Sequence, residues 1–244
     1  QYCKHFIQTS VFGHIDESIQ LSRVIYVCRW MQQMVNRIST QNHFFIRNPI
    51  EEPYTLENYR KAFDIDDDIF VFGHIGRPDN ATYSNLNLRA YSNIETDKTC
   101  FILFGVDELA RKTLDSLNIK NYRLIHKTVD PIAISKFYNT INVLAHSRSD
   151  GEVCPAVIID AQAHSKPIIS HYGEYYQGHI ETIQDSGFTV LKGDVNSYSK
   201  IMKSFIDGKI NIKKLSNNGR KLYEKNNRAI DMALKQLEVY KSLG

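Results

Sequence analysis

Short apolar segments alternate with helix-like stretches from about residue 54 to about residue 208, and this alternation limits the folds open to the chain. Several of the segments are apolar at successive positions, as expected when helices cover both faces of a parallel sheet. Strand–helix alternation predicts a doubly wound α/β domain. Ligands bind such folds beyond the carboxyl ends of the strands, so the residues that follow each strand are the candidates for function.

The elements fill the middle of the chain. The predicted strands are residues 69–75, 99–105, 122–126, 141–145, 167–170 and 188–191. The predicted helices are residues 55–63, 86–93, 107–117, 132–138, 155–164 and 197–205. We therefore predict three parts, divided near a linker at Pro53 and after the last helix. The parts are residues 1–50, 51–208 and 209–244.

The two outer parts have simpler patterns. Residues 1–50 contain an apolar run at 24–28, a helix-like stretch at 29–38 and a second extended run at 43–47. Residues 209–244 have a loose apolar stripe and are predicted to be helical. The chain lacks an initiator Met and starts within a pattern. We therefore expect either a fragment or a chain without an ordered N-terminal part.

The composition excludes several classes of protein. Of the 244 residues, 42% are hydrophobic and 23% are charged, as in an ordinary globular protein. The net charge is only +3, and the lysines near the C-terminus are interleaved with acidic residues, so we expect no nucleic-acid partner. The four cysteines show no CxxC spacing, which argues against a metal site. We find no membrane span and no signal peptide, and we expect a cytoplasmic protein.

Two carboxylates mark the first candidate site. Glu152 follows the apolar strand at 141–145, and Asp160 lies inside the predicted helix that begins with Pro155. Free N–H groups at a helix start can hold an anion, and proline suits the first helical position. The pattern fits a ligand with a phosphate and several hydroxyls, such as a nucleotide sugar. A solvated loop charge and an exposed helix residue would also explain the two carboxylates.

The second candidate site follows the first strand of the domain. Gly76 allows a ligand to approach the backbone closely, and the guanidinium of Arg77 can bind phosphate oxygens through two hydrogen bonds. Alone, this pair also fits a surface turn. Because it follows a strand of the same predicted sheet as Glu152, the two sites reinforce each other. His146 stands out among the histidines, since it follows the strand that leads to Glu152.

Together these segments resemble the C-terminal half of a GT-B-fold glycosyltransferase of family 4, also called glycosyl transferases group 1. The resemblance covers about residues 22–208. The residues that carry it are Gly76-Arg77, 144–147, Glu152-x7-Asp160, 166–170 and 185–190. It implies that residues 51–208 form a Rossmann-like domain for the sugar donor. Residues 1–50 would end the acceptor domain, and residues 209–244 would pack back toward it.

The resemblance also implies roles for single residues. The donor would be bound by Gly76, Arg77, His126, Lys127, Glu152, Val153, Cys154 and Asp160. Arg77 and Glu152 would be the catalytic residues: Arg77 would stabilise the departing nucleoside diphosphate, and Glu152 would contact sugar hydroxyls. Asp160 would hold the ribose. Cationic side chains and a helix N-terminus would stabilise the leaving-group charge, so no metal ion or other cofactor is expected.

The implied activity is the transfer of a hexose, with retention, from a UDP- or GDP-linked sugar to a hydroxyl of a glycan, protein or lipid acceptor. Most of the acceptor domain would lie outside the chain. The family usually has a Lys about five residues after the Arg, where this chain has Thr82. Arg77 could act alone, Arg89 or Arg148 could replace the Lys, or activity could be weak. The alternative is a GT-B module without catalysis that binds nucleotide, glycan or a partner protein.

Overall fold

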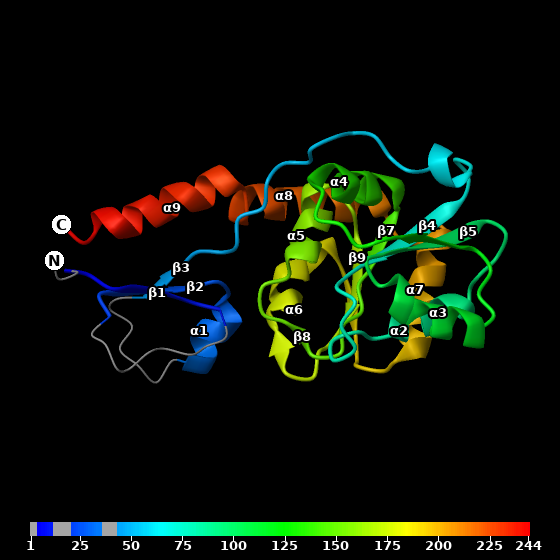
Figure 1. Cartoon of the computed structure of the whole chain (residues 1–244), viewed down its shortest axis with the longest axis horizontal. Helices are drawn as coiled ribbons and strands as arrows, with labels where there is room; N and C mark the ends of the chain where they lie inside the picture. Colours follow the sequence, from blue (N-terminus) through cyan, green and yellow to red (C-terminus); the bar gives the residue numbers. More distant parts are fainter. Residues whose placement is uncertain (1–3, 12–20, 36–42) are drawn as a thin grey trace.

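A computed structural model describes residues 4–11, 21–35 and 43–244 (Figure 1). Its centre is a six-stranded sheet in the order β11-β9-β7-β4-β5-β6, in which all neighbouring strands are parallel. The strands are β4 (Phe70–Ile75), β5 (Thr99–Phe104), β6 (Tyr122–Ile125), β7 (Val143–Ala145), β9 (Ile168–His171) and β11 (Gly187–Val190). The predicted α/β class and all six predicted strands are confirmed.

The strand order reverses in the middle of the sheet. From β4 the chain moves outward to β5 and β6, then crosses back to β7 on the other side of β4 and continues to β9 and β11. The helices that follow β4 and β7 therefore leave in opposite directions, which opens a crevice beyond the carboxyl ends of these two strands.

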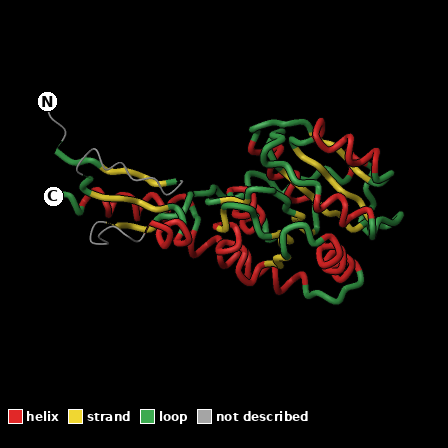
Figure 2. Tube along the Cα trace, turned by 90° about the horizontal axis from the view of Figure 1, so that it is seen from below, coloured by secondary structure: helices red, strands yellow, loops and turns green. Residues whose placement is uncertain are grey.

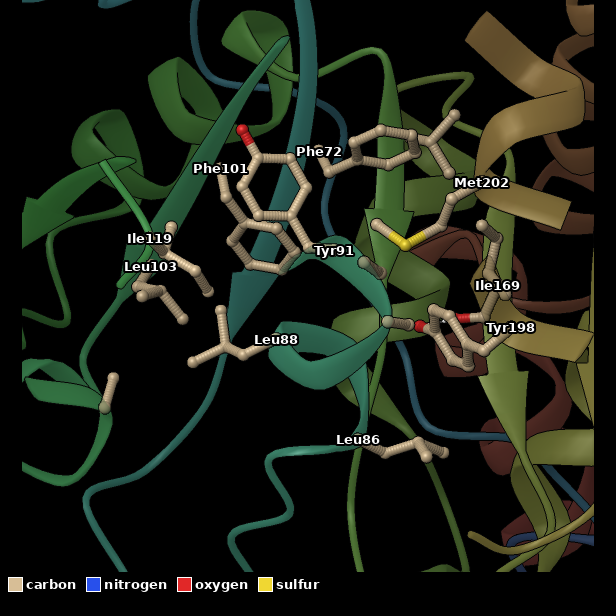
Figure 3. Close-up of a cluster of buried hydrophobic side chains, with 14 of the residues drawn as sticks. Phe72, Leu86, Leu88, Tyr91, Phe101, Leu103, Ile119, Ile169, Tyr198 and Met202 are labelled. Atoms are coloured by element: carbon tan, nitrogen blue, oxygen red, sulfur yellow. Dashed lines mark hydrogen bonds between the residues drawn. The ribbon is translucent and has the colours of Figure 1, made fainter. Parts of the chain in front are cut away.

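Helices cover both faces of this sheet. α2 (Leu86–Ser92), α3 (Asp107–Ser116) and α7 (Val195–Ile206) share a core with the strand residues of one face (Figure 3). α4 (Pro131–Thr140) and α5 (Ala156–Ala163) share a second core with the other face.

Neighbouring strand residues contribute to different cores. Phe72 and Phe101 lie in the first, and Val71 and Ile102 lie in the second. Because successive side chains of a strand point to opposite faces, a strand that is buried on both faces is apolar at successive positions.

One predicted helix of the domain is wrong. Residues 55–63 form an irregular segment that ends in a single 3-10 turn, Lys61–Phe63. The segment runs along α4 and uses its backbone groups there: the N–H of Tyr59 donates to Thr140 Oγ1 (2.8 Å), and Asn139 Nδ2 donates to the carbonyl of Thr55 (2.7 Å). These contacts replace the hydrogen bonds that a helix would make within itself.

Several short elements were not predicted. β8 (Gly151–Glu152) pairs with β10 (Tyr176–Gln177), and α6 (Gly178–Ile183) and a 3-10 turn (Gln184–Ser186) follow. The two strands have two residues each, which is too short for a periodic pattern. Gly151 has a φ of +78°, and a Cβ there would lie 1.9 Å from the carbonyl oxygen of Tyr176. Glycine is therefore required for this pairing.

Residues near the N-terminus form a second parallel sheet, in the order β1-β2-β3. Its strands are β1 (Ile7–Ser10), β2 (Arg23–Tyr26) and β3 (His43–Phe45), and α1 (Arg29–Val35) follows β2. The structure confirms the predicted helix over 29–35, while residues 36–38 lie outside the described part. β1 was not predicted.

The two C-terminal helices pack on different parts of the molecule. α8 (Ile212–Asn226) packs on α5, where Tyr223 is buried with Ile159. α9 (Ala229–Lys241) packs on the N-terminal sheet, where Met232 is buried with Ile25. Both views place α9 along this sheet (Figures 1 and 2). No helix in the described part of the chain combines the length and apolarity needed to cross a membrane.

Glu181 of α6 connects the central domain to the N-terminal part of the chain. Its carboxylate accepts hydrogen bonds from the N–H groups of Arg29 (3.2 Å) and Trp30 (2.8 Å) at the start of α1. It also forms an ion pair with Arg47 (2.8 Å), whose side chain is only 9% exposed. A carboxylate at a helix start is favourable because it satisfies free N–H groups and the helix dipole. Glu181 therefore links α6 to both α1 and the segment after β3.

Candidate functional site

A cavity of about 530 Å³ lies beyond the carboxyl ends of β4, β5, β6 and β7 and at the start of α5. It therefore occupies the crevice where the strand order reverses, as expected for a ligand site in a doubly wound sheet. Its lining includes three basic side chains, Arg77, Lys127 and Arg148, and one acidic side chain, Glu152. This charge distribution suits an anionic ligand that also carries hydroxyl groups.

Two glycines shape the wall of the cavity where β4 and β5 end. Gly76 and Gly105 both line it. Gly105 has a φ of +79°, and a Cβ at this position would lie 2.5 Å from the carbonyl oxygen of Gly76. Any larger residue at 105 would therefore push the two strand ends apart. The next residue after Gly76 is Arg77, whose exposed side chain has no partner among the described residues and lines the cavity.

Glu152 lies on the wall of the cavity that residues after β7 form. Its carboxylate oxygen Oε1 lies 2.9 Å from His146 Nε2, and its backbone N–H donates to His179 Nδ1 (3.2 Å). The Glu152 side chain is 14% exposed and lines the cavity. The structure thus brings Arg77 and Glu152, the two predicted catalytic residues, to one cavity.

The start of α5 closes the same wall. Pro155 is the N-cap residue rather than the first helical residue, and no side chain caps this helix. Ala156 and Val157, in its first turn, line the cavity. The first N–H groups of a helix lack partners within it, so this helix start offers donors and a partial positive charge to an anion.

The other predicted site residues lie at different distances from the cavity. Lys127 and Cys154 line it. His126 is exposed at the end of β6, and Val153 is buried in a separate core cluster with Val24 and Met31; neither side chain is part of the lining. Burial raises the pKa of the Cys154 thiol, which keeps it in the neutral form.

Asp160 lies deeper in α5 and is not part of the cavity lining. Burial raises the pKa of its carboxyl group to about 7, and no hydrogen-bond partner of the carboxylate lies in the described part of the chain. A largely desolvated carboxylate without partners is costly, and such groups gather at functional sites. Asp160 sits on the same helix as the cavity wall, one to two turns from its start.

Sequence reasoning missed several lining residues. Ser147 follows β7, Thr128 and Val129 follow β6, and all three line the cavity; Arg148, named from the sequence only as a replacement for the lysine, lines it too. Their positions directly after predicted strands were the available signal, but the sequence did not show which of them point inward. His146 had been singled out on this signal, and the structure places it on the lining, in contact with Glu152.

The sequence model of the family described as "Glycosyl transferases group 1" matches residues 55–222, more than two thirds of the chain. The chain belongs to glycosyl transferases group 1. The match spans every element that forms the cavity, from β4 to α5, and continues into α8. No curated protein shows a significant match to the sequence.

Solved structures show the same fold. A glycosyltransferase from Rickettsia africae superposes with a TM-score of 0.76 at 17% identity, over 91% of this chain and 63% of that one. Anabaena HepE, solved with UDP and glucose, gives 0.76 at 15% identity over 91% and 63%. A sucrose-phosphate synthase from Thermosynechococcus elongatus gives 0.74 at 16% identity over 92% and 59%. The chain thus has the GT-B fold and spans less than two thirds of each of these proteins.

Within this glycosyl transferases group 1 domain, Thr82 stands where the resemblance places a lysine, and the structure puts it on the cavity lining. Of the two arginines considered as substitutes, Arg148 lines the same cavity, whereas Arg89 lies at a different depression of the surface. Arg148 lies close to Thr82 because its backbone pairs with Tyr83, the residue after Thr82. Its guanidinium is bound by Asp150, with distances of 2.7 and 3.0 Å.

Proposed function

We propose that the cavity binds a nucleoside-diphosphate sugar and that the whole protein transfers a hexose from it to a hydroxyl of a glycan, protein or lipid acceptor. The observation that carries the proposal is the convergence of Arg77, Lys127, the start of α5 and Glu152 on one cavity at the point where the strand order reverses. Membership in glycosyl transferases group 1 supports sugar transfer as the reaction.

Arg77 is proposed to bind the diphosphate of the donor. Its guanidinium can hold phosphate oxygens through two charge-assisted hydrogen bonds. When the bond to the sugar breaks, negative charge builds up on the leaving phosphate. The cations and the start of α5 are already in place to stabilise that charge, which lowers the barrier without rearrangement of the site.

The two carboxylates are proposed to bind hydroxyl groups at the two ends of the donor. Glu152 lines the cavity and would accept hydrogen bonds from the sugar. Asp160 would accept those of the ribose, provided that the nucleotide reaches past the cavity lining along α5. Burial raises the pKa of Asp160 to about 7, and hydrogen bonds donated by ribose hydroxyls would stabilise its ionised form.

We further propose that the reaction retains the configuration of the sugar and needs no metal ion. The basic side chains and the start of α5 can stabilise the leaving diphosphate, which is the task that a metal ion performs in other transferases. The nucleoside diphosphate of the donor is UDP or GDP. The similar fold of Anabaena HepE, solved with UDP-glucose, supports UDP-hexoses as the first donors to test.

The test is a calorimetric titration of the chain with UDP, GDP and ADP and with their hexose conjugates. Arg77→Ala should weaken binding of the preferred nucleoside diphosphate by about 10- to 100-fold, because a charge-assisted hydrogen bond contributes about 1.5–3 kcal/mol. Arg89→Ala removes the same side chain from an exposed site outside the cavity and should leave binding unchanged. Equal affinities in both variants would rule out Arg77 as the phosphate ligand.

A second candidate function is nucleotide or glycan binding without catalysis. Thr82, on the cavity lining in place of a lysine, favours it, because one phosphate-binding cation is absent. The two functions differ in turnover by the whole protein. Donor binding that saturates, with neither transfer nor hydrolysis of the sugar, would establish the binding module. Release of nucleoside diphosphate in the presence of an acceptor would establish the transferase.

A further inference from the structure

Glu152 belongs to a buried hydrogen-bond chain that continues behind the cavity. His146 Nε2 lies 2.9 Å from Glu152 Oε1, and His146 Nδ1 lies 2.7 Å from Ser170 Oγ. His146 is 2% exposed and Ser170 is fully buried, whereas Glu152 faces the cavity. This series of hydrogen bonds therefore runs from Ser170 in β9, through His146 at the end of β7, to Glu152 at the cavity wall.

The partners of His146 determine where its proton resides. An ionised carboxylate can only accept hydrogen bonds, so the hydrogen bond to Glu152 requires a proton on Nε2 of His146. In the neutral ring Nδ1 is then an acceptor, and the hydroxyl of Ser170 can donate to it. Every polar atom of the ring is thus satisfied in one tautomer, which fixes the orientation of the ring.

Two further histidines hold the backbone of the same loop. The N–H of Glu152 donates to His179 Nδ1 (3.2 Å), and His179 Nε2 donates to the carbonyl of His171 (2.8 Å). The N–H of Arg148 donates to His171 Nε2 (3.2 Å), and His171 Nδ1 donates to the carbonyl of Tyr172 (2.8 Å). Burial lowers the pKa of both rings to about 4, so both stay neutral and keep these roles.

The carboxylate of Glu152 has one oxygen left for a ligand. Oε1 is committed to His146, and Oε2 has no hydrogen-bond partner among the described residues. Arg148, a nearby basic residue along the chain, instead donates to Asp150 from Nε and Nη2, one edge of its guanidinium. His146 is therefore the side chain that restricts Glu152, whose side chain would otherwise rotate about three bonds.

We propose that His146 is a positioning residue: by binding Oε1, it holds Oε2 of Glu152 toward the cavity as the acceptor for a hydroxyl of the donor sugar. The inference rests on the proposed function. In this arrangement both ring nitrogens of His146 are bound within the protein, so it acts on the donor through Glu152. Its contribution is therefore confined to the affinity that the sugar adds to that of the nucleoside diphosphate.

The test compares the dissociation constants of a nucleoside diphosphate and its hexose conjugate, UDP and UDP-glucose first. His146→Leu removes the hydrogen bond to Glu152 and fills the space, whereas the side-chain amide of His146→Gln can still donate to it. We expect His146→Leu and Glu152→Ala each to lose about tenfold of the sugar-dependent affinity, which corresponds to one hydrogen bond. Affinity for the nucleoside diphosphate should stay within about twofold, and His146→Gln should retain most of the sugar-dependent affinity.

Other outcomes would overturn the proposal. If His146→Leu keeps the sugar-dependent affinity, His146 does not position Glu152. If both ligands weaken equally, the residue supports the fold of the cavity and has no specific effect on the sugar. If the wild-type chain binds neither ligand while its fold is intact, the proposed function itself fails, and this inference fails with it.

A measurement on the wild-type chain keeps the proposal testable if His146→Leu does not fold. Long-range proton–nitrogen correlation NMR reports which ring nitrogen of each histidine carries the proton. We expect His146 to be protonated on Nε2, and the signal of that proton to weaken or broaden in Glu152→Ala as it becomes exposed to exchange. A neutral ring protonated only on Nδ1 would contradict the proposed contact, because Nε2 could not then donate to Glu152.

Discussion

The carboxyl group of Asp160 makes the stability of the folded chain depend on pH in an unusual direction. Burial raises its pKa from 3.8 to about 7. Between these two values the folded state keeps a proton that the unfolded state releases, so the free energy of unfolding falls as the pH rises. One pKa unit corresponds to about 1.4 kcal/mol, which gives an upper limit of about 4 kcal/mol for the whole window.

Asp160→Asn removes this dependence while keeping the size of the side chain. The buried amide adds a cost that is independent of pH, so the informative quantity is how the stability difference between variant and wild type changes with pH. We expect the difference to move in favour of the variant by as much as about 4 kcal/mol from about pH 4 to about pH 8. Five histidines have lowered pKa values because of burial, and their opposite dependence cancels because both proteins share them.

The assay is urea unfolding of both proteins, followed by circular dichroism, at several pH values across this window. Asp115→Asn, at an exposed position of α3, is the matched control and should give a difference that does not vary with pH. A difference between Asp160→Asn and wild type that is constant with pH would refute the reasoning, because Asp160 would then ionise as easily in the folded chain as in the unfolded one.

Two other predictions concern stability and the cavity. Glu181→Gln should lower the free energy of unfolding by about 3 kcal/mol, measured by urea titration, because it leaves the buried guanidinium of Arg47 without its ion pair; an unchanged midpoint would contradict this. Gly105→Ala should weaken nucleoside-diphosphate binding in calorimetry, since its Cβ would meet the Gly76 carbonyl. Gly193→Ala has the same φ of +79° but open space around it, and should leave binding unchanged.

The central sheet was predictable because its strands are buried on both faces. Phe101, Ile102 and Leu103 lie in alternate cores, so the apolar run in the sequence reflects two separate layers of packing. The segment 55–63 was not predictable in the same way. Its conformation depends on hydrogen bonds to Asn139 and Thr140 of α4, far away in the sequence, which override its local preference for a helix.

The candidate site was predictable at the level of strand ends. Gly76, Arg77 and Glu152 follow β4 and β7, and parallel strands bring their carboxyl ends to one edge of the sheet. The contacts within the site were not predictable, since the distances between side chains depend on the turns that connect the elements. The hydrogen bond from His146 to Glu152 is an example, because it requires Gly151 to place β8 beside β10.

Amide chemical-shift mapping of the chain during titration with UDP-glucose and a GDP-hexose tests the central claim most directly. A nucleotide sugar bound in the cavity should shift the amide signals of Gly76, Ser147 and Val157, which lie after β4, after β7 and in the first turn of α5. The same signals should stay in place in Arg77→Ala at equal ligand concentration. Saturable shifts confined to other parts of the molecule, or no shifts for the folded chain, would contradict the donor site proposed for this cavity.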